Sequence, residues 1–80
     1  MNHAMEHIVE RIASTENFTE EKARKKLNLI YVKMNAAGVR QFVDEFINWL
    51  MDKRQLNFKQ ILKTPDKELF EIFEKEFKNV

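Results

Sequence analysis

The chain has 80 residues, with no cysteine, one glycine and one proline, and its 14 basic residues balance 13 acidic ones to a net charge of +1. This length supports one domain with one core, and the lack of cysteine excludes disulfide and thiolate chemistry. Glycine and proline are the strongest breakers of regular structure, so their scarcity predicts an all-α fold. We expect a single helical domain over residues 1–80.

The chain begins with apolar residues at helical spacing, namely Met5, Ile8, Val9 and Ile12. This pattern predicts an amphipathic helix over about 3–14, ended by the polar run 14–17. Charged residues interrupt the apolar pattern, so it lacks the basic flank and unbroken apolar stretch of a signal peptide. No window approaches the roughly 18 apolar residues that span a bilayer. The sequence therefore predicts a cytoplasmic protein that does not use a membrane as a partner.

Thr19 has the residue type of an N-cap, and the two acids that follow it favour the positive end of a helix dipole. A second helix is therefore expected over about 20–36. Its predicted inward face consists of Ala23, Leu27, Ile30, Tyr31 and Met34. Gly38 suits the left-handed position that ends a helix, so we expect a tight reversal and an antiparallel pairing with the next helix.

The third predicted helix, over about 39–53, has an unusually wide apolar face of about 200°. Its apolar residues are Val39, Phe42, Val43, Phe46, Ile47, Trp49, Leu50 and Met51. One interpretation is a central helix with neighbours on two sides. The other is that Trp49 and Met51, at the edges of the face, stay exposed and serve a partner.

Asn57 is a candidate N-cap for a short helical turn near 58–62. Thr64 and Pro65 have the residue types of the N-cap and first position of a last helix, over about 65–78. That helix is expected to place Leu69, Ile72, Phe73 and Phe77 inward, with Phe70 at the edge. The sequence thus predicts a compact bundle of four main helices with one short helical turn.

The charge is unevenly distributed along the chain. Residues 22–63 hold ten of the 14 cations and three of the 13 acids, a net charge of +7, whereas residues 1–21 sum to −4 and residues 64–80 to −2. Either the acidic ends lie over the basic middle, or the middle is free for an anionic partner.

The second helix carries apolar residues among lysines, away from its main core face. We identify Lys22, Lys25, Leu29, Val32 and Lys33 as candidate partner-binding residues. Such a strip suits a protein with a hydrophobic centre and an acidic rim. Alternatively, the two apolar residues pack against another helix. Nucleic acid is the less favoured partner, because no aromatic residue interleaves with these lysines to stack on bases.

Nine aromatic residues in so short a chain predict that some apolar surface stays exposed. A twofold homodimer would cover it, and Trp49, Met51 and Phe70 are the candidate dimerisation residues.

Catalytic and metal signatures are weak. Every serine and threonine lies at a predicted helix boundary, where capping explains it. His3 and His7 share one helical face but supply only two of the three or four protein ligands that zinc takes. We predict no catalytic residue, no cofactor and no bound metal. The expected function is a small non-enzymatic protein–protein interaction module, acting as an adaptor or regulator.

Overall fold

A computed structural model describes residues 3–79 of the chain, apart from the side chain of His3, and every regular element in this range is helical. The elements are α1 (His3–Glu16), α2 (Glu20–Ala37), α3 (Val43–Lys53), α4 (Phe58–Lys63), α5 (Asp66–Ile72) and the π-helical segment η1 (Phe73–Phe77). The predicted all-α class is confirmed. The four predicted main helices and the short helix near 58–62 are also confirmed, since α5 and η1 together form the predicted last helix.

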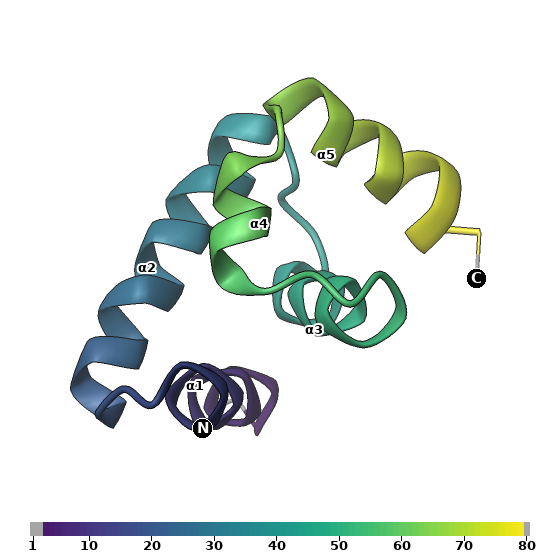
Figure 1. The fold of residues 1–80 in the computed structure, drawn as a ribbon. Coiled ribbons are helices and arrows are strands. Elements are labelled where there is room, and N and C mark those ends of the chain that lie inside the picture. The colour runs from purple at the N-terminus through teal and green to yellow at the C-terminus, as the bar shows by residue number, and fades with distance from the viewer. Residues whose placement is uncertain (1–2, 80) are drawn as a thin grey trace.

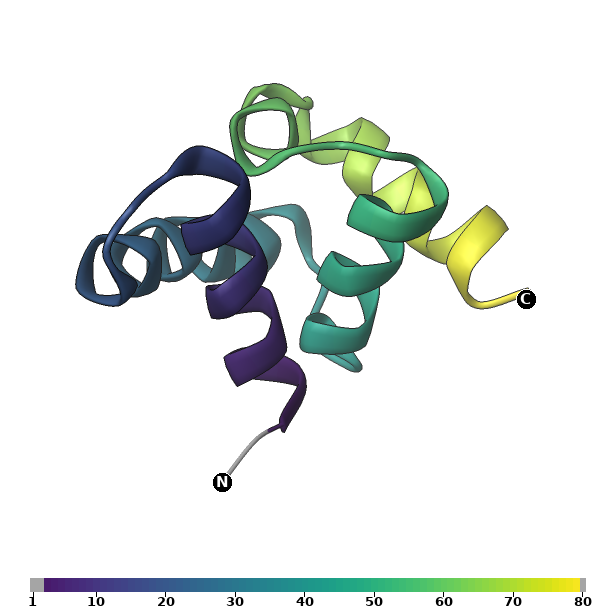
Figure 2. The same cartoon turned by 60° about the horizontal axis from the view of Figure 1, so that its bottom comes forward.

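The helices cross at steep angles around one core. In Figure 1, α2 and α5 descend on either side from a common apex, with α4 between them, while α1 and α3 are seen nearly end-on. α2 packs against α1, α4 and α5, and α3 packs against α1 and η1. Figure 2 also shows α3 crossing α2 steeply. The predicted antiparallel pairing of the second and third helices is therefore wrong.

The ends of α2 follow the sequence signals. The Thr19 hydroxyl accepts a hydrogen bond from the Lys22 amide at 3.2 Å, as an N-cap does. Gly38 adopts the left-handed conformation with φ 90°, and its amide donates to the Asn35 carbonyl. The amide of Val39 donates to Met34 at 2.9 Å. Carbonyls of the last turn are thereby satisfied, which stabilises the helix end.

The third helix begins at Val43 rather than near Val39, which corrects the predicted boundary. Val39 is buried but not helical, and Phe42 adopts a left-handed conformation with φ 52°. The Phe42 side chain is 64% exposed. Phe42 therefore does not belong to the apolar core face that the sequence pattern predicted for the third helix. Asp44 and Glu45 then occupy the first turn, where the helix dipole favours acids.

The ends of α4 confirm one predicted cap and correct another. Asn57 and Gln60 exchange side-chain and backbone hydrogen bonds in a capping box at the start of α4. Thr64, predicted to cap the last helix, instead donates its hydroxyl proton to the Gln60 carbonyl at 2.7 Å and so closes α4. α5 starts at Asp66, directly after Pro65, with no side-chain cap among the described residues.

α3 contributes several of the largest buried side chains of the core. They include Phe46, Ile47 and Leu50, which are fully buried. The Phe46 ring lies 5.1 Å from Phe73 and 5.2 Å from Phe77, between ring centroids. α3 thus has neighbours on two sides, α1 and η1, as the central-helix interpretation expects.

Gly38→Ala tests the left-handed turn. A Cβ at this position would meet Phe70 carbons at 3.5 and 3.7 Å, which is ordinary contact, so the cost comes from the backbone alone. We expect a loss of about 1 kcal/mol in the free energy of unfolding, and a melting temperature lower by about 4–8 °C. Gly38→Asn should lose less, because asparagine tolerates this conformation. Equal melting temperatures for Gly38→Ala and the parent protein would contradict this account.

Candidate interaction surface

The outer face of α2 carries two large apolar side chains exposed to solvent. Leu29 is 51% exposed and Val32 is 68% exposed. The helix buries its opposite face, which consists of Ala23, Leu27, Ile30 and Met34. At about 100° of rotation per residue, Leu29 and Val32 point away from the core. The alternative that these two residues pack against another helix of the chain is therefore wrong.

Of the three lysines predicted to bind a partner, Lys22 and Lys25 are exposed on this side of the molecule. Lys25 reaches Glu21 only at 4.0 Å, and both side chains are mostly exposed, so this ion pair contributes little. The Lys22 ammonium lies 4.2 Å from the centroid of the Phe18 ring. Lys22, Lys25 and Lys26 also line a shallow depression at the start of α2, together with Thr19 and Glu21.

Lys33 has a different position from the other predicted lysines. Its ammonium lies 2.7 Å from the Asp66 carboxylate, and its side chain is only 19% exposed. The pair joins α2 to the first turn of α5. The structure therefore brings Lys22, Lys25, Leu29 and Val32 to one open surface, which we call the α2 outer face, and directs Lys33 toward α5.

The three candidate dimerisation residues lie in different settings. Trp49 is half-buried, with its ring 5.7 Å from that of Phe77, and Met51 is buried within the chain. Phe70 remains 40% exposed beside Gly38. The most exposed aromatic side chain among the described residues is instead Phe42, which the sequence analysis placed in the core. The acids at positions 44 and 45 were the signal that the helix starts after it.

The histidine pair gains no further ligands in the structure. His7 is exposed on α1, while the side chain of His3 lies outside the described part of the chain. Among the described residues, no group of three or more histidine, aspartate and glutamate side chains is placed to hold a metal ion.

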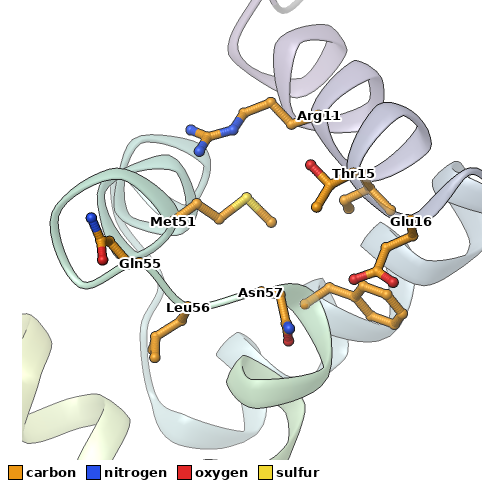
Figure 3. Close-up of a pocket in the computed structure, with 9 residues that line it drawn as sticks. Arg11, Thr15, Glu16, Met51, Gln55, Leu56 and Asn57 are labelled. Atoms are coloured by element: carbon orange, nitrogen blue, oxygen red, sulfur yellow. The ribbon is translucent and has the colours of Figure 1, made fainter.

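A pocket of about 200 Å³ lies between the last turns of α1 and the connection from α3 to α4 (Figure 3). Its lining residues are Arg11, Ile12, Thr15, Glu16, Met51, Gln55, Leu56, Asn57 and Phe58. The Arg11 guanidinium donates to Asp52 at 2.6 Å and to Asn48 at 3.0 Å, and so joins α1 to α3. The sequence carries no local signal for this pocket, because its walls come from segments that only the fold brings together.

Tyr31 connects α2 to the first turn of α3. Its hydroxyl donates a hydrogen bond of 2.5 Å to the Asp44 carboxylate. Burial raises the pKa of Tyr31 well above its ordinary value, and the hydrogen bond and negative charge of Asp44 raise it further. Each effect disfavours the tyrosinate, since burial removes water from the charged form and ionisation would put a second negative charge beside Asp44.

No protein family, curated protein or solved structure compared with the chain matches it. Within residues 3–79, none of the helices combines the length and the apolar character needed to cross a bilayer.

Tyr31 is the only tyrosine of the chain, so tyrosinate absorbance reports on this residue alone. We expect it to ionise well above pH 10, its usual value being about 10. Because the folded pKa is raised, the stability it contributes is fully present below about pH 10 and is lost as the pH rises further.

Tyr31→Phe is the matched control for this linkage. We expect it to lower the free energy of unfolding at neutral pH by about 1 kcal/mol, the net worth of one hydrogen bond. Between neutral pH and about pH 11, the variant should also lose less free energy of unfolding than the parent protein, because it has no tyrosine to ionise. Urea unfolding at neutral pH and at about pH 11 measures both effects. An ordinary tyrosine titration in the folded protein would contradict the role given to burial and Asp44.

Proposed function

We propose that the protein is a small non-enzymatic interaction module, an adaptor or regulator, that binds another protein through the α2 outer face. The observation that carries this proposal is the exposure of Leu29 and Val32 on a helix whose opposite face is fully buried. Two large apolar side chains one helical turn apart provide a centre for a desolvated contact. The cysteine-free composition agrees with a cytoplasmic site of action.

The charges around this centre favour a particular kind of partner. Lys22 is exposed about two helical turns before Leu29, and Lys25 is held only weakly by Glu21. Acidic groups on a partner could therefore meet both ammonium groups without first breaking a strong ion pair. We propose a partner with an apolar strip that covers Leu29 and Val32, and with carboxylates at its rim that speed association.

Nucleic acid binding is the second candidate, supported by the net charge of +7 on residues 22–63. Two cations of this segment are already paired with acids from the C-terminal end: Lys33 with Asp66, and Arg54 with Glu76 at 2.9 Å. These pairs reduce the positive charge available to phosphates. Phosphate binding would also leave Leu29 and Val32 without a role, so we favour a protein partner.

Homodimerisation is a further form of the proposal, with the exposed Phe70 as the candidate contact. Light scattering at two concentrations about tenfold apart tests it, because mass action changes the mass of a dissociating dimer. Phe70→Glu should then give a monomer if this ring lies in the dimer contact.

The double variant Leu29→Asp, Val32→Asp tests the protein-binding proposal. Both side chains are exposed, so we expect the melting temperature to change little. Binding to a partner obtained by affinity capture and then purified should weaken more than tenfold, because central apolar contacts dominate such interfaces. Lys59→Glu on α4, also exposed, is the control for altered surface charge and should bind normally.

Salt dependence separates the two candidate functions. If the partner is a protein held by the apolar pair, affinity should fall only modestly as ionic strength rises, and Lys22→Ala, Lys25→Ala should mainly slow association. A steep loss of affinity with salt, together with normal binding by the Leu29→Asp, Val32→Asp variant, would favour nucleic acid and contradict the main proposal.

A further inference from the structure

The pocket between α1 and α4 combines an apolar floor with a polar rim. Ile12, Met51 and Phe58 contribute side chains that are at most 9% exposed. Figure 3 shows Thr15 and Glu16 on the α1 side of the pocket, with Met51, Gln55 and Asn57 across from them. The volume of about 200 Å³ is below the range of about 300–1,000 Å³ typical of small-molecule sites. The pocket is therefore suited to a single side chain.

Glu16 makes the α1 side of this pocket electronegative. It is the last residue of α1, it is half-buried, and its carboxylate forms no hydrogen bond or ion pair with any described residue. The last turn of α1 contains no basic residue. Since a helix C-terminus carries a partial negative charge of about half a unit, the carboxylate and the helix dipole repel one another and both favour a cation.

The other charges near the pocket leave Glu16 uncompensated. Arg11 lies on the rim, but Asp52 neutralises it at 2.6 Å and Asn48 fixes its guanidinium. The ammonium of Lys26 lies 6.0 Å from the Phe58 ring centroid and forms no ion pair with Glu16. The side chain of Asn57 is held in the capping box of α4. Since Arg11 is paired with Asp52, Glu16 is the lining residue whose charge has no partner among the described residues.

We propose that this pocket binds a lysine side chain of a partner protein. The stem of a lysine, four methylene groups long, would cover Ile12, Met51 and Phe58, and its ammonium would donate to the Glu16 carboxylate. The small volume of the pocket, about 200 Å³, favours the compact ammonium of lysine over the larger planar guanidinium of arginine. The site is distinct from the α2 outer face and does not depend on the function proposed for that face.

Two blocked tripeptides test the proposal: Ala-Lys-Ala and its neutral counterpart with norleucine in place of lysine. Each is titrated into the isotopically labelled protein while backbone amide shifts are recorded. We expect the lysine peptide to shift the amides of Glu16, Met51 and Leu56, and to bind about fivefold more tightly than the norleucine peptide. Equal binding of the two peptides, or shifts confined to other regions, would overturn the proposal.

Glu16→Gln assigns the effect to the carboxylate. It should weaken binding of the lysine peptide about fivefold and leave the norleucine peptide unchanged. The variant should also fold normally, because removing an acid from a helix C-terminus does not destabilise the helix. Glu10→Gln, an exposed acid on α1 outside the pocket, is the matched control and should bind like the parent protein. Unchanged lysine-peptide binding by Glu16→Gln would contradict the proposed role.

Discussion

The helices α1, α4 and α5 all pack against α2, and its 18 residues are enough to contact all three. α3 completes the core through α1 and η1, with Phe46 at the centre of a cluster of aromatic rings. Because all of α2's neighbours lie on one side of it, the opposite side faces solvent along the whole helix. The exposure of Leu29 and Val32 is thus a consequence of the architecture as well as of their position in the sequence.

Ion pairs between distant segments connect the basic middle of the chain to its ends. Lys33 meets Asp66, Arg54 meets Glu76, and Arg11 meets Asp52. Each is at least partly exposed, so each adds little to stability. They also neutralise cations that would otherwise be free for an anionic partner. The lysines near the start of α2 keep most of their charge available, and there it lies beside apolar surface.

The sequence predicted those elements whose signals are local. Apolar periodicity and caps gave α1 and α2 to within two residues, and the Asn57 cap of α4 was also correct. The start of α3 was wrong, because Phe42 continues the apolar pattern although its backbone is left-handed. An apolar residue extends a periodic pattern whether or not its side chain is buried, so periodicity alone could not place this boundary.

The candidate sites also differ in whether their signals are local in the sequence. Leu29 and Val32 were identifiable from helical geometry, because their exposure depends on the rotation of one helix relative to its own core face. The pairing of Lys33 with Asp66 and the pocket beside Glu16 depend on contacts between segments that are distant in sequence. No local pattern encodes those contacts, and the steep crossing of the helices that creates them was not predicted.

The two candidate sites are close enough to share structural support. Phe58 lines the pocket, its ring lies 5.8 Å from that of Phe18, and Lys22 of the α2 outer face lies over Phe18. Phe58 is also part of the core, so a substitution there would disturb the pocket, the lysine edge of α2 and the stability of the fold together. Leu29 and Glu16 lie outside this aromatic contact. A substitution of Leu29 changes only the α2 outer face, and a substitution of Glu16 changes only the pocket. Effects measured at these two positions can therefore be assigned to separate binding events, provided that the melting temperature of each variant stays that of the parent protein.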